Sequence, residues 1–289
     1  MAESFQFDGL QFAVIGDPIN HSLSPAMHNA AFSAAGKNAE YTAIRVAPED
    51  MEAFFATAKK SLSGFNVTVP HKGAAMRLSD RLSDAAALSG SVNTVRINPD
   101  GTTDGDTTDG AGFERAIAEA FDLPLAGTDL CFIGCGGVVQ ALVWHCALAG
   151  VRSIRILNRS LDKAQQLTGS IRNRFPQIVT DCAAISDREK TADFLAQTRL
   201  AVQCTSVGLH ADDPAPVDPA LFPAEGLFYF DTIYRRTALL AALDQRGIPT
   251  QDGLAMLLHQ GAKSYEIWFD EPAPVEVMRT ALIQAINNR

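Results

Sequence analysis

Lys72 is the first residue in this chain whose type and position suggest acid–base chemistry. It ends the stretch 65-FNVTVPHK-72, whose apolar residues, Val69 included, alternate with polar ones as in a half-buried strand. Pro70 cannot donate a ladder hydrogen bond, so we expect the strand to end there and Lys72 to lie on the turn into the next helix. Its amine can carry a proton if its pKa is lowered or if a carboxylate aligns it. A solvated surface charge is the alternative.

Asp109 is the carboxylate that could pair with this lysine. It lies in the polar stretch 105-GDTTDGAG-112, where we expect Gly110 and Gly112 to permit a tight bend before a helix begins. Oxidation of an alcohol sends a hydride to a nicotinamide and a proton to a positioned base. Lys72 and Asp109 together would form such an acid–base dyad, although the spacing alone leaves two unrelated surface charges open.

A glycine-rich turn, 134-GCGG-137, follows the predicted strand 129-DLCFIG-134 and opens a predicted helix over 138–150. Glycine in such a turn lets backbone N–H groups approach a pyrophosphate at the positive end of the helix. The pattern is shorter than G-x-G-x-x-G because Val139 occupies the third glycine position, so a simple tight turn is the alternative. The order strand, turn, helix, strand favours a dinucleotide site.

The end of the next predicted strand, 153-SIRILN-158, indicates which dinucleotide binds. An NAD site usually has Asp or Glu there to hold the ribose 2′-hydroxyl. This chain has Arg159 and Ser160 instead, followed by Lys163. A guanidinium pairs bidentately with phosphate oxygens, so the sequence favours NADP, with NAD still usable. A surface arginine at a helix start is the alternative.

The elements that must carry these groups alternate between strand-like and helix-length runs. The strand-like run 12-FAVIG-16 precedes the amphipathic run 25-PAMHNAAFSAAG-36, and a second series begins after the polar loop 98–112. Repeated strand–helix units predict an α/β fold with a parallel or mixed sheet. We take the polar loop as the boundary between two domains.

Composition excludes several functional classes. The 289 residues are 47% hydrophobic and 20% charged, which is typical of a two-domain globular enzyme. A net charge of -9 without a block of Lys or Arg disfavours nucleic acid and anionic membranes, which leaves a small-molecule partner. Five cysteines without a C-x-x-C pair, and no H-E-x-x-H motif, predict neither a disulfide framework nor a metal site. With no signal-peptide pattern, we expect a cytoplasmic protein.

Eight segments spread over most of the chain form a specific set of motifs. They run in chain order: 16-GDPINHSLSPAMHNAAF-32, 65-FNVTVPHK-72, 90-GSVNTV-95, 108-TDGAG-112, 134-GCGG-137, 158-NRS-160, 203-QCTSVGL-209 and 252-DGLAMLLHQGAKSYEIW-268. Taken together they resemble the shikimate dehydrogenase family, which includes quinate/shikimate dehydrogenases. The resemblance implies reversible NAD(P)-dependent oxidation of shikimate to 3-dehydroshikimate, a step of the chorismate pathway of aromatic amino acid biosynthesis, with Lys72 and Asp109 matching the catalytic pair.

The same resemblance implies a substrate site and a cofactor site. Ser22 and Ser24 match an S-x-S pair that binds the substrate carboxylate. The groups expected near the substrate ring and the nicotinamide are Asn66, Thr68, Asn93, Tyr234 and Gln260. The residues expected to bind the cofactor are Gly134, Cys135, Gly136, Gly137, Val138, Asn158, Arg159, Ser160, Lys163, Thr205 and Gly253.

The family architecture implies a substrate-binding and catalytic domain over residues 1–110, completed by C-terminal helices 254–289. A Rossmann-type NAD(P)-binding domain over 111–253 is inserted between them, and we expect a monomer or a homodimer. Three departures indicate a divergent paralogue: 107-TTDG-110 in place of Asn-Thr-Asp-Gly, 203-QCTS-206 in place of Asn-Ala-Thr-Ser, and a short 231-DTIYRRTALL-240. Quinate or an aminated analogue as the substrate, and a dinucleotide-binding sensor with little catalysis, are the alternatives.

Overall fold

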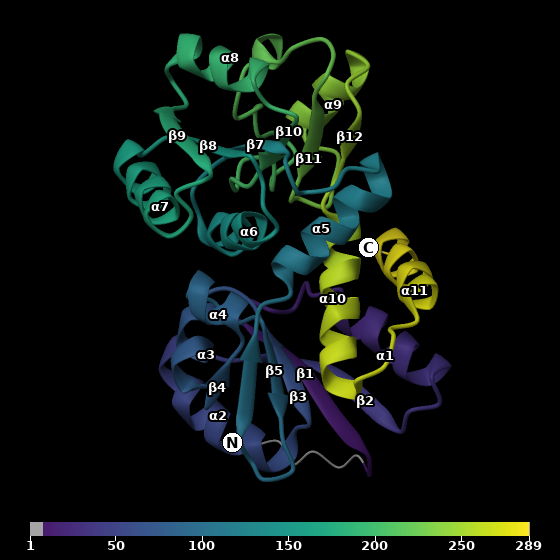
Figure 1. Cartoon of the computed structure of the whole chain (residues 1–289). Coiled ribbons are helices and arrows are strands. Elements are labelled where there is room, and N and C mark those ends of the chain that lie inside the picture. The colour runs from purple at the N-terminus through teal and green to yellow at the C-terminus, as the bar shows by residue number, and fades with distance from the viewer. Residues whose placement is uncertain (1–7, 289) are drawn as a thin grey trace. The chain divides into compact units, whose positions relative to one another are not determined.

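The computed structural model describes residues 8–288, and the chain divides into two compact units. Unit 1 comprises Met1–Gly112 and Leu258–Arg289, and unit 2 comprises Phe113–Leu257. Each unit has its own six-stranded sheet flanked by helices (Figure 1). The α/β class and the two-domain organisation predicted from the sequence are confirmed.

The sheet of unit 1 is mixed, with strand order β2-β1-β3-β5-β6-β4. β1 pairs in parallel with both β2 and β3, whereas β5 runs antiparallel to β3 and β6. The strands are β1 (Leu10–Gly16), β2 (Ala39–Arg45), β3 (Gly64–Val67), β4 (Arg81–Leu82), β5 (Thr94–Ile97) and β6 (Thr103–Asp106).

Helices cover both faces of this sheet (Figure 1). On one face lie α2 (Met51–Ser61), α3 (Lys72–Leu78) and α4 (Asp84–Ser89), and on the other α1 (Ser24–Ala34), α10 (Leu254–Phe269) and α11 (Val275–Asn287). Phe55 of α2 packs edge-on against Phe65 of β3 on the first face, while Trp268 of α10 packs against Phe12 of β1 on the second. Gly64 permits the close approach of α10, because a Cβ there would lie 2.5 Å from Trp268 Nε1.

The sheet of unit 2 is parallel throughout, with strand order β12-β11-β10-β7-β8-β9. The chain reverses its direction of travel across the sheet between β7 and β10, and ligands of open α/β sheets bind outside the carboxyl ends of the strands at such a point. The strands are β7 (Asp129–Ile133), β8 (Ser153–Asn158), β9 (Val179–Ala184), β10 (Leu200–Gln203), β11 (Phe228–Asp231) and β12 (Thr250–Gln251).

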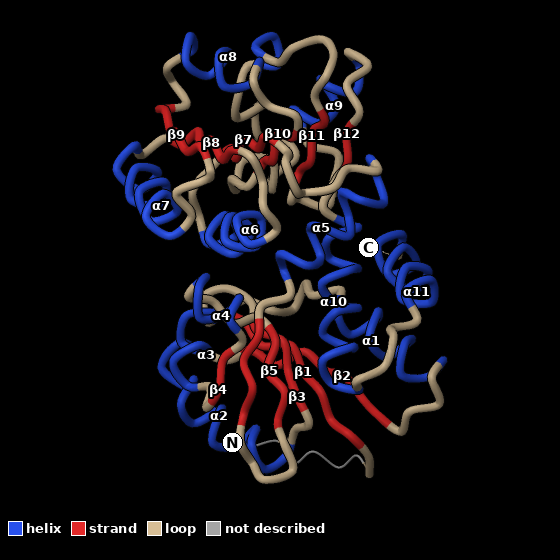
Figure 2. Tube along the Cα trace, in the orientation of Figure 1, coloured by secondary structure: helices blue, strands red, loops and turns tan. Residues whose placement is uncertain are grey.

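Helices also sandwich this second sheet. α5 (Asp109–Phe121) enters unit 2 from unit 1, and α6 (Gly137–Leu148) and α7 (Leu161–Arg174) cover one face of the sheet (Figure 2). α8 (Arg188–Ala196) and α9 (Ala238–Gln245) cover the other face, where Leu195 and Leu239 join the buried core beneath β7 and β10. The two short 3-10 helices are Pro48–Asp50 in unit 1 and Pro219–Leu221 in unit 2.

The half-buried strand predicted over 65–69 is wrong in extent and in pattern. β3 ends at Val67, and all four of its residues are buried because helices pack on both faces of this central strand. Val69, expected on the buried side, is 67% exposed in a turn. Lys72 is the first residue of α3 and does not lie on the turn before it.

The polar segment 98–112 is not a continuous loop. It contains β6, and α5 begins at Asp109, so Gly110 and Gly112 are helical and make no bend. Gly112 meets a different requirement: a Cβ there would lie 2.7 Å from the backbone nitrogen of Gln260. Glycine at this position therefore permits close packing of α5 against α10.

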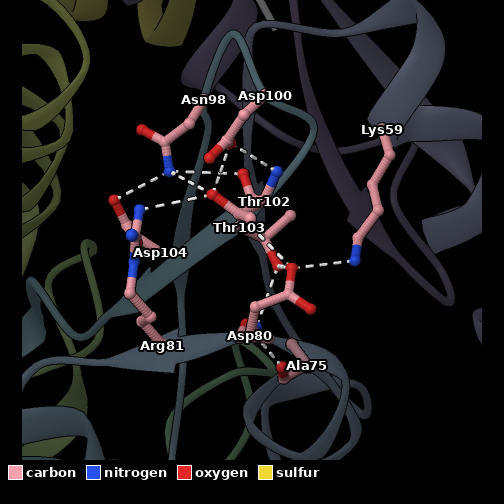
Figure 3. Close-up of polar contacts among 10 residues, drawn as sticks. Lys59, Ala75, Asp80, Arg81, Asn98, Asp100, Thr102, Thr103 and Asp104 are labelled. Atoms are coloured by element: carbon pink, nitrogen blue, oxygen red, sulfur yellow. Dashed lines mark hydrogen bonds and ion pairs between the residues drawn. The ribbon is translucent and has the colours of Figure 1, made fainter.

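A polar cluster ties the carboxyl end of α3 to β6 (Figure 3). Asp80 Oδ2 accepts hydrogen bonds from Lys59 Nζ, Thr103 N and Thr103 Oγ1, each at 2.8 Å. These bonds, that from Lys59 most strongly, lower the pKa of Asp80 to about 2. α3 begins with Lys72, and β6 ends shortly before Asp109, the first residue of α5. The cluster therefore links the two elements that position Lys72 and Asp109.

Within residues 8–288, no helix is long and apolar enough to cross a membrane. The same residues contain no group of three or more His, Cys, Asp or Glu side chains that could hold a metal ion. The five cysteines are free; Cys135 and Cys182 are partly exposed and the other three are buried.

Candidate active site

Lys72 and Asp109 contact each other directly in unit 1. Lys72 Nζ donates a hydrogen bond of 2.6 Å to Asp109 Oδ2, and the side chains are 23% and 10% exposed. Each is the first residue of its helix, α3 or α5. The two residues are therefore an ion pair, and the alternative of two unrelated surface charges is wrong. An amine held against a carboxylate at a partly exposed position can exchange a proton with a bound hydroxyl.

Asn93 holds the second oxygen of this carboxylate. Its Nδ2 donates to Asp109 Oδ1 at 2.8 Å, while its Oδ1 accepts from the backbone N–H of Thr108 at 2.8 Å. A backbone N–H can only donate, so the orientation of the Asn93 amide is determined. Each oxygen of Asp109 thus has its own donor, and Asn93, expected to bind the substrate ring, also aligns the dyad.

The neighbouring predicted substrate groups Asn66 and Thr68 differ in availability. Asn66 is buried, its Oδ1 accepts from the hydroxyl of Tyr41 at 2.7 Å, and its Nδ2 donates to Ser264 Oγ at 2.9 Å. Thr68 is half-buried with its methyl toward Gly16, where a Cβ would lie 2.6 Å from it. Its hydroxyl has no hydrogen bond among residues 8–288. A ligand hydroxyl can therefore reach Thr68 without displacing an internal partner, unlike Asn66.

The S-x-S pair opens α1. Ser22 Oγ accepts a hydrogen bond from the backbone N–H of Ser24 at 3.3 Å, which leaves the Ser22 proton available to an anion. Ser24 is buried beside Tyr41. Burial raises the pKa of the Tyr41 phenol well above its ordinary value, and a hydrogen bond with Ser24 opposes that shift. The phenol therefore stays protonated and can donate to Asn66.

The last two predicted substrate groups lie in different units. Gln260 is in the part of α10 that belongs to unit 1, packed at its backbone against Gly112. Tyr234 lies in unit 2, on the loop after β11, and is 46% exposed.

The glycine-rich turn of unit 2 forms an open helix N-terminus at the carboxyl end of β7 (Figure 2). Gly134 has φ +110°, and a Cβ there would lie 2.9 Å from Thr205 Cγ2. Gly136 and Gly137 are exposed. Apart from adjacent residues and the helix's own backbone, no atom of residues 8–288 lies within 4 Å of where their Cβ atoms would be, and no side chain among these residues caps α6. Free N–H groups with open space in front of them suit a dinucleotide phosphate. The next residue, Val138, is partly buried.

The positively charged residues after β8 are exposed. Arg159, Ser160 and Lys163 all face solvent, and within residues 8–288 neither Arg159 nor Lys163 forms an ion pair with a carboxylate. Burial raises the pKa of the Cys135 thiol, and the nearby charge of Lys163 opposes this shift, so Lys163 lies close to the glycine-rich turn. Asn158 Nδ2 donates to the backbone oxygen of Ser160 at 2.8 Å and shapes the strand end.

Two buried side chains that were not predicted as site residues organise the neighbouring loops. Gln203 Oε1 accepts from Thr205 N, and its Nε2 donates to the carbonyl of Val207, both at 2.8 Å. Asp231 accepts from Thr237 Oγ1 at 2.7 Å and from Ile233 N at 3.0 Å, and burial raises its pKa. The available signal was a polar residue at the end of an apolar strand, LAVQ and FYFD, which marks a loop anchor at a ligand-binding edge.

Gly253 stands opposite the start of the Tyr234 loop. A Cβ there would lie 2.3 Å from the carbonyl oxygen of Thr232, and Gly253 N donates to the carbonyl of Ile233 at 3.1 Å. Glycine is needed here for close backbone packing, which holds the loop that carries Tyr234.

Comparison with known sequences matches the chain to two family models and to curated relatives. The family model for the shikimate dehydrogenase substrate binding domain matches residues 14–95, and that for the shikimate 5'-dehydrogenase C-terminal domain matches residues 253–283. The curated shikimate dehydrogenase (NADP(+)) of Symbiobacterium thermophilum is 39% identical over 286 residues, which cover 97% of this chain and 96% of that protein.

Solved structures agree with the sequence comparison. Shikimate 5-dehydrogenase from Listeria monocytogenes, in complex with shikimate and NAD, superposes with a TM-score of 0.89 at 32% identity, over 98% of this chain and 99% of that one. Shikimate 5-dehydrogenase from Thermus thermophilus, in complex with NADP(H) and shikimate, gives a TM-score of 0.82 at 32% identity, over 96% and 99%.

The fold, the ion pair and the glycine-rich turn, together with these relatives, define an oxidoreductase that acts on a CH–OH group. The curated relative that is 39% identical over nearly the whole chain identifies the family. The chain belongs to the shikimate dehydrogenase family, and the resemblance found in its motifs is confirmed.

Proposed function

We propose that this chain catalyses the reversible NADP-dependent oxidation of shikimate to 3-dehydroshikimate. The observation that carries the proposal is the ion pair of Lys72 and Asp109 at 2.6 Å, within the unit that contains the substrate-binding family match. The names of the curated relatives support shikimate and NADP as the reactants. They do not favour the quinate alternative.

Lys72 moves the proton in this proposal. In the direction of oxidation, its neutral amine accepts the proton of the substrate hydroxyl, and Asp109 stabilises the ammonium that forms. In the direction of reduction, the ammonium donates that proton to the carbonyl oxygen of 3-dehydroshikimate. NADP, when bound, supplies the hydride acceptor or donor. Asn93 keeps Asp109 oriented in both directions through its 2.8 Å bond.

The substrate carboxylate binds at the start of α1 in this proposal. Ser22 retains a free proton for it, and the hydroxyl of Ser24 lies close by in sequence and structure. Thr68 and Gln260, both in unit 1, are the groups proposed to contact ring hydroxyls. Asn66 is proposed to stabilise the neighbouring strand and helix and not to bind the substrate directly, because its polar atoms already form hydrogen bonds with Tyr41 and Ser264.

NADP is proposed to bind at the carboxyl edge of the unit 2 sheet. The residues present fit it: the backbone of Gly136 and Gly137 would hold the pyrophosphate, and Arg159 with Lys163 would hold the 2′-phosphate. Lysine acts on a phosphate as a point charge without the fork of arginine, so we expect the preference for NADP to be moderate and NAD to remain usable.

A steady-state assay of shikimate and of quinate, each with NADP and with NAD, tests the proposed function. We expect the highest kcat/KM for shikimate with NADP. Faster oxidation of quinate than of shikimate would contradict the substrate assignment, and a preference for NAD would contradict the cofactor assignment. No turnover with any of the four pairs would contradict the catalytic proposal itself.

A further inference from the structure

A buried group of hydroxyls and amides lies directly behind the dyad in unit 1. Ser264 of α10, which is completely buried, has its Oγ 2.8 Å from Thr94 Oγ1 and accepts a hydrogen bond of 2.9 Å from Asn66 Nδ2. Its single proton is within reach of two acceptors, Thr94 Oγ1 and the carbonyl oxygen of Gln260, which is 3.0 Å away. Ser264 is separated from Asn66 and Thr94 by 198 and 170 positions, so the chain's return through α10 brings these groups together.

The directions of these hydrogen bonds lead toward Asp109. Thr94 Oγ1 donates to Asn93 Oδ1 at 3.0 Å, and the same oxygen accepts from Thr108 N. Because Asn93 Oδ1 is held by these donors, Asn93 Nδ2 must face Asp109, to which it donates. When Ser264 donates its proton to Thr94, the nearer of its two acceptors, a continuous path of hydrogen bonds runs from Ser264 through Thr94 and Asn93 to the carboxylate.

We propose that Ser264 is a positioning residue for Asp109, acting through Thr94 and Asn93. The inference rests on the proposed role of Lys72 and Asp109 in proton transfer. Buried polar groups that lose a partner rearrange to find another, because no water replaces the missing bond. Without the Ser264 hydroxyl, Thr94 loses its 2.8 Å partner and holds Asn93 less firmly, so Asp109 and the proton on Lys72 are aligned in a smaller fraction of molecules.

The expected signature is a loss in kcat with little change in binding. Ser264→Ala should lower kcat with shikimate by about threefold to tenfold, the effect of one hydrogen bond between neutral groups. KM for NADP should stay within about twofold, because the cofactor-binding residues belong to unit 2. Thr94→Val should lower kcat to a similar extent, whereas Thr94→Ser, which keeps the hydroxyl, should restore most of it.

Ser89→Ala is the matched control. Ser89 is also a buried serine of unit 1, but its hydroxyl bonds to the backbone carbonyls of Ala86 and Ser91. It should change kcat by less than about twofold. A cooperative thermal unfolding transition shows that a variant is folded. The kinetics of all variants are compared at a temperature below the lowest of their unfolding midpoints.

A double-mutant cycle with Asn93→Ala decides the route. If Ser264 acts through Asn93, Ser264→Ala should cause no further loss of kcat in the Asn93→Ala background. Losses that multiply, or a Ser264→Ala kcat within twofold of wild type, would overturn the inference. The proposed function fails separately, if Lys72→Ala retains full turnover or if the wild-type chain does not oxidise shikimate.

Discussion

The ion-pair site of unit 1 and the glycine-rich turn of unit 2 differ in how far their polar groups are already paired. Both oxygens of Asp109 have donors, and the amides behind it are committed to buried partners. The turn at Gly136 and Gly137 is open, with an uncapped helix N-terminus and, among residues 8–288, cationic residues nearby that form no ion pair. A proton-transfer site gains from groups held in advance, whereas an anion-binding site needs donors left free for the ligand.

Replacing Lys72 tests the prearranged site most severely. Lys72→Ala should lower kcat roughly 100- to 10,000-fold, the usual range for a lost acid–base group, with little change in the affinity for NADP. Steady-state kinetics and cofactor titration by fluorescence measure the two effects. Asp109→Asn should also be severe, and the double variant should be no worse than the poorer single one. A Lys72→Ala enzyme with more than about a tenth of wild-type kcat would exclude Lys72 as the proton carrier.

Removing both hydroxyls at the start of α1 should give the next largest effect. Each hydroxyl that donates to a carboxylate contributes about 1.5–3 kcal/mol, so Ser22→Ala with Ser24→Ala should weaken shikimate binding by more than about 100-fold. Calorimetry measures the dissociation constant directly. Ser33→Ala, an exposed serine of the same helix, is the control. Normal shikimate binding by the double variant would mean that the carboxylate binds elsewhere.

Arg159 tests the open site. Arg159→Ala should raise KM for NADP roughly tenfold to a hundredfold and leave KM for NAD nearly unchanged, because only NADP carries the 2′-phosphate. Arg174→Ala, an exposed arginine of α7, should affect neither cofactor. An equal loss with both cofactors would show that Arg159 supports the loop without recognising the phosphate.

The smallest expected effect concerns His28 and the pH dependence of folding stability, and not the rate of turnover. It is fully buried against Tyr41, with ring centroids 4.4 Å apart, and neither ring nitrogen has a hydrogen-bond partner among residues 8–288. Burial lowers its pKa to about 3. As pH falls below about 6.5 the unfolded chain takes up a proton that the folded chain does not, so stability declines until pH approaches the folded value.

At pH 5 this uptake should reduce the free energy of unfolding by about 2 kcal/mol relative to pH 7. Urea unfolding at both pH values should show a smaller decline for His28→Phe than for wild type. His210→Gln, which removes an exposed imidazole, should decline as wild type does. An unchanged decline in His28→Phe would show that other groups cause the acid sensitivity.

Much of this protein could be predicted from local sequence. The alternation of strands and helices determined the α/β class, and the glycine-rich turn with Arg159 after the next strand indicated a dinucleotide site, because these features depend on residues close together in the chain. The sequence left two interpretations of Lys72 and Asp109, an ion pair or two unrelated charges, because the distance in space between residues 37 positions apart cannot be inferred from their spacing in the chain. The return of the C-terminal helices came from family resemblance and not from any pattern.

Tertiary structure alone decided which polar groups remain available. Asn66 and Thr68 look equivalent in an alternating strand, yet Asn66 is committed to Tyr41 and Ser264 while the Thr68 hydroxyl has no partner among residues 8–288. The sequence predicts a bend at Gly112, whereas in the structure this glycine permits close packing against Gln260. The physical reason is the same for both. Hydrophobic periodicity and secondary-structure propensity depend on residues close together in the chain. Hydrogen-bond partners and packing depend on segments that lie up to 198 positions away.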